Sequence, residues 1–413
     1  MIKFKTFTLE NGLRFVVHQD SSTPIVAMNI LYDVGARDEH PDKTGFAHLF
    51  EHLMFGGSVN IPKYDEPLQI AGGENNAFTN SDYTNYYLTL PKDNLETAFW
   101  LESDRMLNLA FSPKSLEVQR QVVTEEFRQN YLNQPYGDVW LLLKPLVYHH
   151  HPYQWNTIGK EIAHIEQAEL DDVKDFYARF YNPNNAIVAI AGDVKLSEIK
   201  SLAVKWFASI PKGPENTRSL AVEPPQQEER RLIVKRAVPA NAIYKAWRMC
   251  GKMEPDYEAC DLISDLLGTG QSSRLHKELV IRQGLFTEIS AFITGDHDPG
   301  LLVIHGKIKE GIDPQHADTA IETIIAAFKS QPPSETELRK VKNRIVSGQV
   351  FSDITVLSKA MNLAYYTYLG DTKLVNTAIK NYRKVSAASI AEVANRILIP
   401  NNCSTLFYLK DNE

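Results

Sequence analysis

Two stretches of this 413-residue chain share one pattern, ARFYNPNNAIVAIAGDV at 178–194 and NRILIPNNCSTLFYLKD at 395–411. In each, a helix-like segment precedes a Pro-Asn-Asn turn and a strand-like apolar run follows it. The turns begin at Pro183 and Pro400, an offset of 217 residues. A helix, turn and strand that occur twice in the same order indicate an internal duplication, which decides the fold.

A second echo supports the duplication. AHLFEHLMFGG at 47–57 resembles CDLISDLLGTG at 260–270, an offset of 213 residues. Between the repeats, PKGPENTRSLAVEPPQQEER at 211–230 is rich in proline and polar residues, which is typical of an interdomain linker. We therefore expect one domain over 1–211, a linker over 212–230 and a second, homologous domain over 231–413.

Strand and helix signals alternate in both halves, which predicts an α+β fold. IVAMNILYDV (25–34) and AIVAIAG (186–192) have the composition of strands, whereas ETELRKVKNRIVSGQVF (335–351) has that of a helix. Most strand segments alternate in polarity. Each domain is thus expected to hold a mostly antiparallel sheet, with one face under helices and the other toward a shared interior or solvent.

Composition excludes several classes of function. Lys and Arg number 44 against 51 for Asp and Glu, and no block of like charge indicates a nucleic-acid or anionic-membrane partner. The cysteines, Cys250, Cys260 and Cys403, form no CxxC pair, which favours a reducing compartment. The start of the sequence lacks a signal-peptide pattern, and no apolar run is long enough for a membrane span. We expect a cytoplasmic location, with a periplasmic or exported one as the alternative if a signal has been trimmed.

The segment PDKTGFAHLFEHLMFGG (41–57) predicts a helix that begins at Asp42 or Thr44 and ends at Gly56-Gly57. On such a helix His48, Glu51 and His52 fall within an arc of about 100°. Two imidazoles one turn apart can bind one metal ion, and a carboxylate beside them can act as a base. The alternative is a surface helix with solvated histidines, but Leu49 and Phe50 and their neighbours favour a mostly buried one.

A catalytic zinc site takes three protein ligands, so a third must come from elsewhere in the chain. A second predicted helix, PKSLEVQRQVVTEEFRQNYL (113–132), offers Glu125 and Glu126. Glu126 lies about 100° from the core residue Phe127, whereas Glu125 lies about 200° away on the expected solvent side. Glu126 is therefore the better candidate, because a half-buried carboxylate needs a cation. On a preceding predicted helix, Glu102 and Asp104 read most simply as solvated or paired surface acids.

Together these residues resemble the inverted-motif zinc peptidases of the pitrilysin and insulin-degrading enzyme family, in particular bacterial members related to the mitochondrial processing peptidase. The likeness extends over nearly the whole chain, including NGLRFVV, GFAHLFEHLMFGGS, NNAFTNSDYTNYY, RQVVTEEF, HPYQWNTIG and SSRLHKEL. It implies two homologous α+β domains that form one half of a clamshell. It also implies one Zn²⁺ per chain, bound by His48, His52 and Glu126, with Glu51 as the catalytic base.

The resemblance carries further site residues. It implies that Asn76, Ala77, Phe78 and Thr79 form an edge strand that holds a substrate peptide by its backbone. Family members commonly have a second glutamate two turns before the third ligand, where this chain has Gln119. Glutamine adds no negative charge near the ligands, so we expect weaker metal binding.

The second half lacks the chemistry. Asp261, Ser264 and Asp265 stand at the positions of His48, Glu51 and His52, so this half is expected to be catalytically silent. The tract His149–His151 reads as a loop near the site rather than a second metal site, because adjacent residues on an extended chain point to opposite faces.

In active relatives an Arg and, seven positions later, a Tyr from this half bind substrate across an enclosed chamber. Val280 and Thr287 occupy those positions here, and Arg282 lies two residues away. The resemblance thus implies a zinc endopeptidase subunit acting on peptides or unfolded segments in a heterodimer with a zinc-less homologue. A homodimer is the alternative assembly, and a non-catalytic scaffold or peptide-binding subunit is the alternative function.

Overall fold

The computed structural model describes residues 1–411, which form two compact units, each built around one sheet. Unit 1 consists of residues 1–128, 155–220 and 350–377, and unit 2 of the remaining segments. The predicted α+β class is confirmed. The compact units are not continuous halves of the chain, so the linker at 212–230 stays a prediction.

The sheet of unit 1 has the strand order β1-β2-β6-β3-β5-β4, and the sheet of unit 2 has the order β7-β11-β8-β10-β9. Strands β2 and β6 are parallel, as are β7 and β11, and the other neighbours are antiparallel. Without β1, the two sheets have one topology, which confirms the duplication. The strands are β1 (Lys5–Thr8), β2 (Arg14–Gln19), β3 (Ile25–Tyr32), β4 (Glu74–Thr79), β5 (Thr84–Pro91), β6 (Ala186–Gly192), β7 (Arg230–Arg236), β8 (Ala242–Arg248), β9 (Phe286–Ile293), β10 (Leu301–Ile308) and β11 (Cys403–Lys410).

The helices repeat in the same way. Five follow β5 and five follow β10, and the last of each set leads through a Pro-Asn-Asn turn into an interior strand of the sheet, β6 or β11. The first set is α3 (Leu95–Leu107), α4 (Pro113–Phe127), α5 (Val139–Val147), α6 (Ile162–Glu166) and α7 (Leu170–Phe180). The second set is α10 (Pro314–Ser330), α11 (Glu335–Ser352), α12 (Val356–Tyr368), α13 (Leu374–Lys384) and α14 (Ala387–Ile397). The other helices are α1 (Phe46–Leu53), α2 (Asp65–Ile70), α8 (Leu196–Phe207) and α9 (Tyr257–Gly268).

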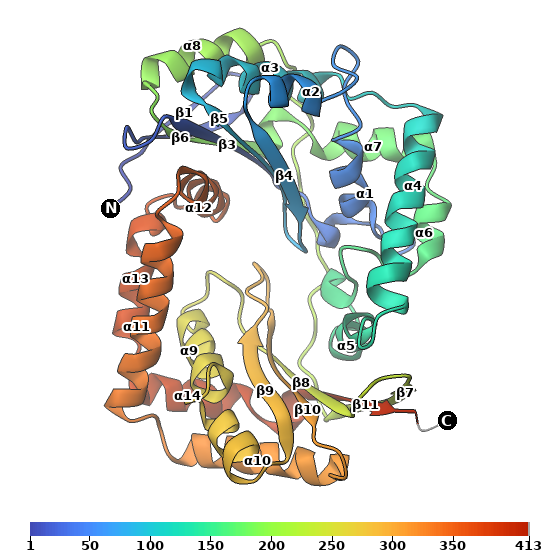
Figure 1. Cartoon of the computed structure of the whole chain (residues 1–413), viewed down its shortest axis with the longest axis vertical. Coiled ribbons are helices and arrows are strands. Elements are labelled where there is room, and N and C mark those ends of the chain that lie inside the picture. Colours follow the sequence, from blue (N-terminus) through green and yellow to red (C-terminus); the bar gives the residue numbers. More distant parts are fainter. Residues whose placement is uncertain (412–413) are drawn as a thin grey trace. The chain divides into compact units, whose positions relative to one another are not determined.

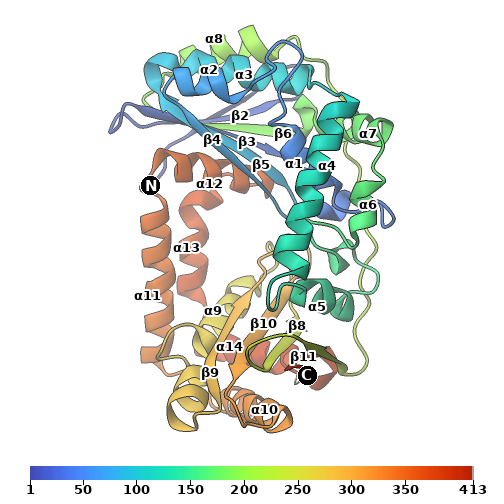
Figure 2. The same cartoon turned by 45° about the vertical axis from the view of Figure 1, so that its right-hand side comes forward.

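Helices cover both faces of the unit 1 sheet, so the expectation of one uncovered face is wrong. On one face, Phe15 of β2 packs against Phe207 of α8 with ring centroids 6.0 Å apart. On the other face, Val16 and its neighbours in β3 and β6 pack against Ala360 and Leu363 of α12. Figures 1 and 2 show α3 and α8 on one side of this sheet and α12 on the other. The fully buried run of β6 fits a strand that has no solvent face.

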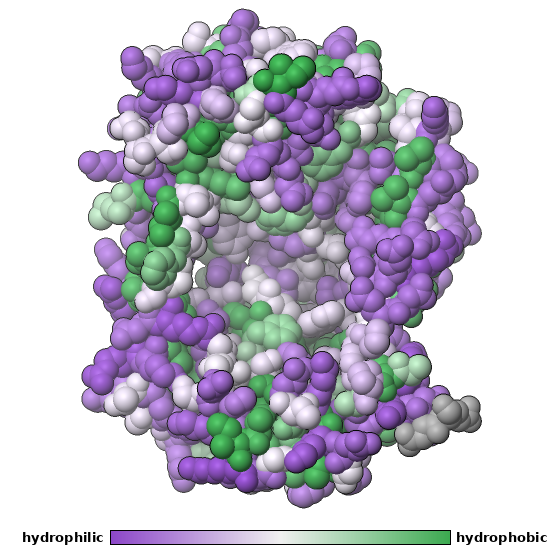
Figure 3. All heavy atoms as spheres, in the orientation of Figure 1, coloured by the Kyte–Doolittle hydropathy of each residue, from purple (hydrophilic) through white to green (hydrophobic). Residues whose placement is uncertain are grey.

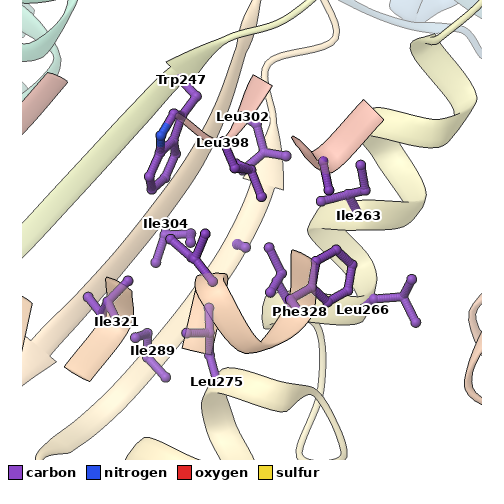
Figure 4. Close-up of a cluster of buried hydrophobic side chains, with 14 of the residues drawn as sticks. Trp247, Ile263, Leu266, Leu275, Ile289, Leu302, Ile304, Ile321, Phe328 and Leu398 are labelled. Atoms are coloured by element: carbon purple, nitrogen blue, oxygen red, sulfur yellow. The ribbon is translucent and has the colours of Figure 1, made fainter. Parts of the chain in front are cut away.

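The unit 2 sheet is also covered twice. Figure 4 shows part of the larger core, in which Trp247 and Ile304 of the sheet meet Ile263 of α9 and Phe328 of α10. The opposite face packs against Leu143 and its neighbours in α5. In sequence order α5 and α12 are equivalent helices, the third after β5 and the third after β10. Each covers the sheet formed by the other half of the chain, and no local sequence pattern could have indicated this exchange.

Polar side chains cover most of the face seen in Figure 3, with hydrophobic groups scattered among them. Across residues 1–411, no helix has the length and apolar character that a bilayer span requires. Cys250, Cys260 and Cys403 are free thiols. The compartment stays a prediction.

The exchanged helices generate a stability test. Leu363 of α12 and Leu143 of α5 are fully buried, and Leu→Ala at either site should cost about 2–5 kcal/mol. We expect Leu363→Ala to accelerate amide hydrogen exchange in β2, β3 and β6, and Leu143→Ala to do so in β8, β10 and β11. Each variant is the control for the other. Equal acceleration in both sheets by either variant would contradict the assignment of these helices.

Candidate metal centre

Helix α1 presents His48, Glu51 and His52 on its half-buried side. Its apolar side faces the core, where Phe50 stacks on Tyr181 with ring centroids 5.0 Å apart. This packing fixes the rotation of the helix, because the apolar and polar residues alternate with helical period. The three polar side chains therefore lie on the opposite, half-buried side of the helix.

The predicted start of α1 is wrong. The helix begins at Phe46, after Gly45 in a left-handed conformation with φ of 90°. Thr44 does not cap it, because the Thr44 hydroxyl is engaged with His164 Nδ1 at 2.8 Å. Asp42 is exposed and lies outside the helix. Tertiary contacts of the preceding loop therefore set where the helix begins.

Helix α4 brings Glu126 to the two histidines. The Nε2 atoms of His48 and His52 are 3.3 Å apart, and Glu126 Oε2 lies 3.6 Å from the first and 3.5 Å from the second. Ligand atoms about 2.0–2.1 Å from a tetrahedral zinc ion lie about 3.3–3.4 Å from one another. The three donor atoms are therefore placed closely enough to share one ion. Glu125, the alternative from the sequence, is exposed and pairs with Arg128.

The chemistry of the donor set fits zinc. Burial lowers the pKa of His48 to about 4, with a further contribution from His52 and an opposing one from Glu126. A neutral imidazole is the form that binds a metal ion. Within residues 1–411, this is the only cluster of three or more potential His, Cys, Asp or Glu ligands.

Glu51 lies beside the end of β4. Burial raises the pKa of the Glu51 carboxyl group, and its neighbours Thr79 and His52 offset part of that rise. A carboxyl group with a raised pKa holds a proton more readily than an exposed glutamate does. Its position about one turn after His48 and directly before His52 on α1 suits a group that exchanges protons at the centre.

Asn76, Ala77, Phe78 and Thr79 all lie in β4, the last strand of the unit 1 sheet. β4 pairs with β5 on one side only, so its outer backbone groups are not part of the ladder. Since Thr79 neighbours Glu51, this edge runs up to the candidate base. The substrate role of the four residues stays a prediction.

Gln119 lies seven residues before Glu126 and therefore on nearly the same face of α4. It is half-buried, and its side chain makes no hydrogen bond to any residue between 1 and 411. His48 Nδ1 is buried and likewise has no hydrogen-bond partner among those residues. A metal-binding histidine usually donates its second ring N–H to an acceptor. His48 lacks that support among the described residues, and the influence of Gln119 on metal binding stays a prediction.

The equivalent helix of unit 2, α9, contributes to no cluster of three potential metal ligands among the described residues. The Tyr382 hydroxyl donates to Asp261 Oδ2 at 2.6 Å, and Arg344 Nη1 pairs with Asp265 Oδ1 at 3.0 Å. Ser264 donates to the Asp261 backbone carbonyl. Ordinary hydrogen bonds and an ion pair thus engage the residues that stand where unit 1 has its donors.

The histidine tract forms a loop in unit 2. The Glu223 carboxylate accepts backbone N–H groups from His149, His150 and His151 at 2.7–3.0 Å. The His151 ring lies 3.5 Å from Asp298. The tract belongs to no metal cluster of the described residues.

Sequence reasoning misplaces one acid and misses another. Glu102 is not a surface acid: it is 1% exposed and accepts two hydrogen bonds from Arg105 at 2.7 and 2.8 Å. Glu39 was not singled out, yet it is buried and accepts backbone N–H groups at the start of α1. The sequence signal that could have indicated this capping role is an acidic residue a few positions before a helix whose own N-cap residue is glycine.

Comparison with known proteins agrees with this geometry. Residues 14–150 match the family model described as insulinase (peptidase family M16), and residues 167–345 match the one described as peptidase M16 inactive domain. The chain is 28% identical to the zinc protease PqqE of Helicobacter pylori, over 98% of this chain and 92% of that protein. It is 25% identical to the uncharacterized zinc protease YmxG of Bacillus subtilis, over 95% of each.

A solved structure described as a protease from Helicobacter pylori superposes with a TM-score of 0.93 at 27% identity, covering 99% of this chain and all of that one. The two family matches include strands of both sheets, and the first contains all four residues of the candidate centre. The chain therefore belongs to peptidase family M16, the insulinase family.

Proposed function

We propose that this chain is a zinc-dependent endopeptidase subunit that hydrolyses peptides or unfolded segments. The observation that carries the proposal is the convergence of His48 Nε2, His52 Nε2 and Glu126 Oε2, with separations of 3.3–3.6 Å. Three protein ligands are the number a catalytic zinc site uses, leaving a position open for water or substrate. The names of the zinc protease relatives support the same class of activity.

A zinc ion bound by these residues supplies a Lewis acid that polarises the scissile carbonyl and activates water. Glu51 is the group that moves the proton: its carboxylate accepts it from the attacking water and then donates it to the leaving amine nitrogen. The raised pKa of Glu51 suits this double role, because burial makes its carboxyl group hold a proton more readily than an exposed glutamate does.

The substrate is an extended peptide segment that adds to the outer edge of β4. That edge offers main-chain donors and acceptors in a row, and Thr79 at its end neighbours Glu51. Recognition through the backbone places few demands on side chains. It requires a segment that is not already hydrogen-bonded in a folded structure.

The chain acts with a homologous partner that lacks the metal ligands. The resemblance assigns an Arg and a Tyr to positions 280 and 287, but Val280 packs against the apolar core of unit 2 and Thr287 is an exposed residue of β9. Arg282 is exposed and pairs with Glu278 at 3.0 Å. The partner supplies the missing pair, whereas a homodimer of this chain would lack it.

Ligand substitutions test the metal centre. His48→Ala and Glu126→Gln each remove one of three donors, so zinc affinity should fall by at least about a hundredfold, more than the loss of a supporting residue costs. Zinc bound to the purified protein is measured by metal analysis and chelator competition. Glu125→Gln, next to Glu126 but exposed, is the matched control and should bind zinc normally. Normal zinc binding in both ligand variants would contradict the site.

Glu51→Gln tests the base. The amide cannot accept the proton, so peptide hydrolysis should fall by about 10²–10⁴-fold while zinc content is unchanged. The measurement is cleavage of a fluorogenic peptide, with the exposed Glu66→Gln as control. Normal turnover by Glu51→Gln would rule out Glu51 as the base. A wild-type protein that binds zinc and peptide yet never cleaves would support the scaffold or peptide-binding alternative instead.

The partner is tested by assaying the chain alone and after mixing with a homologue from the same cell that lacks H-x-x-E-H. Because the loss of one transition-state donor costs about 10²–10³ in rate, we expect mixing to raise activity by at least about a hundredfold. Mass measurement in solution should show a one-to-one complex. Full activity of the chain alone, unchanged by any such homologue, would contradict the heterodimer.

A further inference from the structure

The start of α1 has no capping residue of its own. Gly45 occupies the N-cap position, and a Cβ atom there would lie 2.8 Å from the Ile158 carbonyl oxygen. The position is thus restricted to glycine, which has no side chain to accept a hydrogen bond. The first turn also carries no acidic residue. The backbone N–H groups that begin a helix nevertheless need acceptors.

Glu39 supplies those acceptors from outside the helix. Its Oε2 accepts the Gly45 N–H at 2.9 Å, and its Oε1 accepts the Ala47 N–H at 2.8 Å. Glu39 is 6% exposed, so water does not compete for these two hydrogen bonds. One carboxylate thereby caps the start of α1 by accepting the backbone N–H groups of Gly45 and Ala47.

The segment that carries Glu39 is itself fixed. The backbone N–H groups of Ala36 and Arg37 donate to the carbonyls of Asn80 and Ser81 at 3.1 and 2.9 Å. The Arg37 guanidinium pairs with Asp82 at 3.0 Å. Residues 80–82 follow β4 directly, so Glu39 connects the start of α1 to the end of the edge strand.

The Glu39 carboxyl group is held largely away from water. Burial raises the pKa of Glu39 to about 8, and the backbone donors of Ala47 and Gly45 offset only part of the rise. A carboxyl group with a raised pKa stabilises the fold below its ordinary pKa and loses that contribution as the pH rises through about 8.

We propose that Glu39 is a positioning residue for the metal centre, setting the place of α1 along its axis and thereby the affinity for the ion. His48 follows Ala47 directly, so any displacement of the first turn moves this ligand before it moves His52. Metal ligands must lie within about 0.2 Å of their bonding distances, so small displacements weaken binding. The inference rests on the zinc site of the proposed function.

The test compares two substitutions of Glu39. Glu39→Met keeps the length of the side chain but removes both acceptors, whereas Glu39→Gln keeps one. We expect the zinc dissociation constant of Glu39→Met to rise about tenfold or more and that of Glu39→Gln to rise less. The visible absorption of the cobalt-loaded protein reports ligand geometry and should change in the same order.

Asp313→Ala is the matched control. Asp313 caps α10 by accepting the His316 N–H at 3.0 Å, and it lies in unit 2. Its loss should lower the melting temperature without changing the zinc dissociation constant. A role of Glu39 in stability alone would make the Glu39 variants behave like this control.

Each outcome decides the matter. A folded Glu39→Met protein with the wild-type dissociation constant and cobalt spectrum overturns the positioning role. If Glu39→Met does not fold, the same result with Glu39→Gln overturns it. A wild-type protein that binds neither zinc nor cobalt overturns the metal site and this role together, whereas wild-type binding that survives both Glu39 substitutions overturns this role alone.

Discussion

A β-sheet with two apolar faces has to be covered on both sides, and this requirement organises the chain. In each unit, helices from the same half of the sequence cover one face, and a helix from the other half covers the second. Val16 and Ala189 of the unit 1 sheet meet Leu363, whereas the unit 2 sheet meets Leu143. The boundaries of the compact units therefore follow the burial of apolar surface rather than the order of the chain.

The two units share this scaffold but differ in the side chains that one equivalent helix carries. The helix between the second and third strands of the repeat carries His48, Glu51 and His52 in unit 1, and Asp261, Ser264 and Asp265 in unit 2. The former meet a carboxylate from α4, and the latter are engaged by Tyr382 and Arg344. The scaffold alone thus confers no chemistry, which depends on the residues grafted onto it.

Local patterns were sufficient to predict much of the centre. The spacing of His48, Glu51 and His52 is a property of one helix, and the choice of Glu126 over Glu125 follows from helical rotation relative to Phe127. The repeated Pro-Asn-Asn turns likewise indicated the duplication, because the signal lies in adjacent residues. All of these features depend on residues that lie close together in the sequence.

The features that were not predicted depend on distant contacts. Nothing near Val356 indicates that α12 covers a sheet whose strands end at Gly192. Helix α1 begins later than its sequence suggests because Glu39 replaces a local cap. Glu102 is buried because Arg105 pairs with it inside the core, and the Arg105 guanidinium in turn lies over the rings of Tyr64 and Tyr86.

The exchange of helices also has a consequence for biosynthesis. In chain order, the final strand of the unit 1 sheet is β6, which ends at Gly192, but the helix that covers the second face of this sheet begins only at Val356. While the intervening segment is being translated, that face has no intramolecular cover and presents apolar surface to any chaperone at the ribosome. Most of the unit that contains the metal ligands is therefore translated first. It can complete its fold only after the ribosome has also translated strands β7 to β10 of the second unit and then α12.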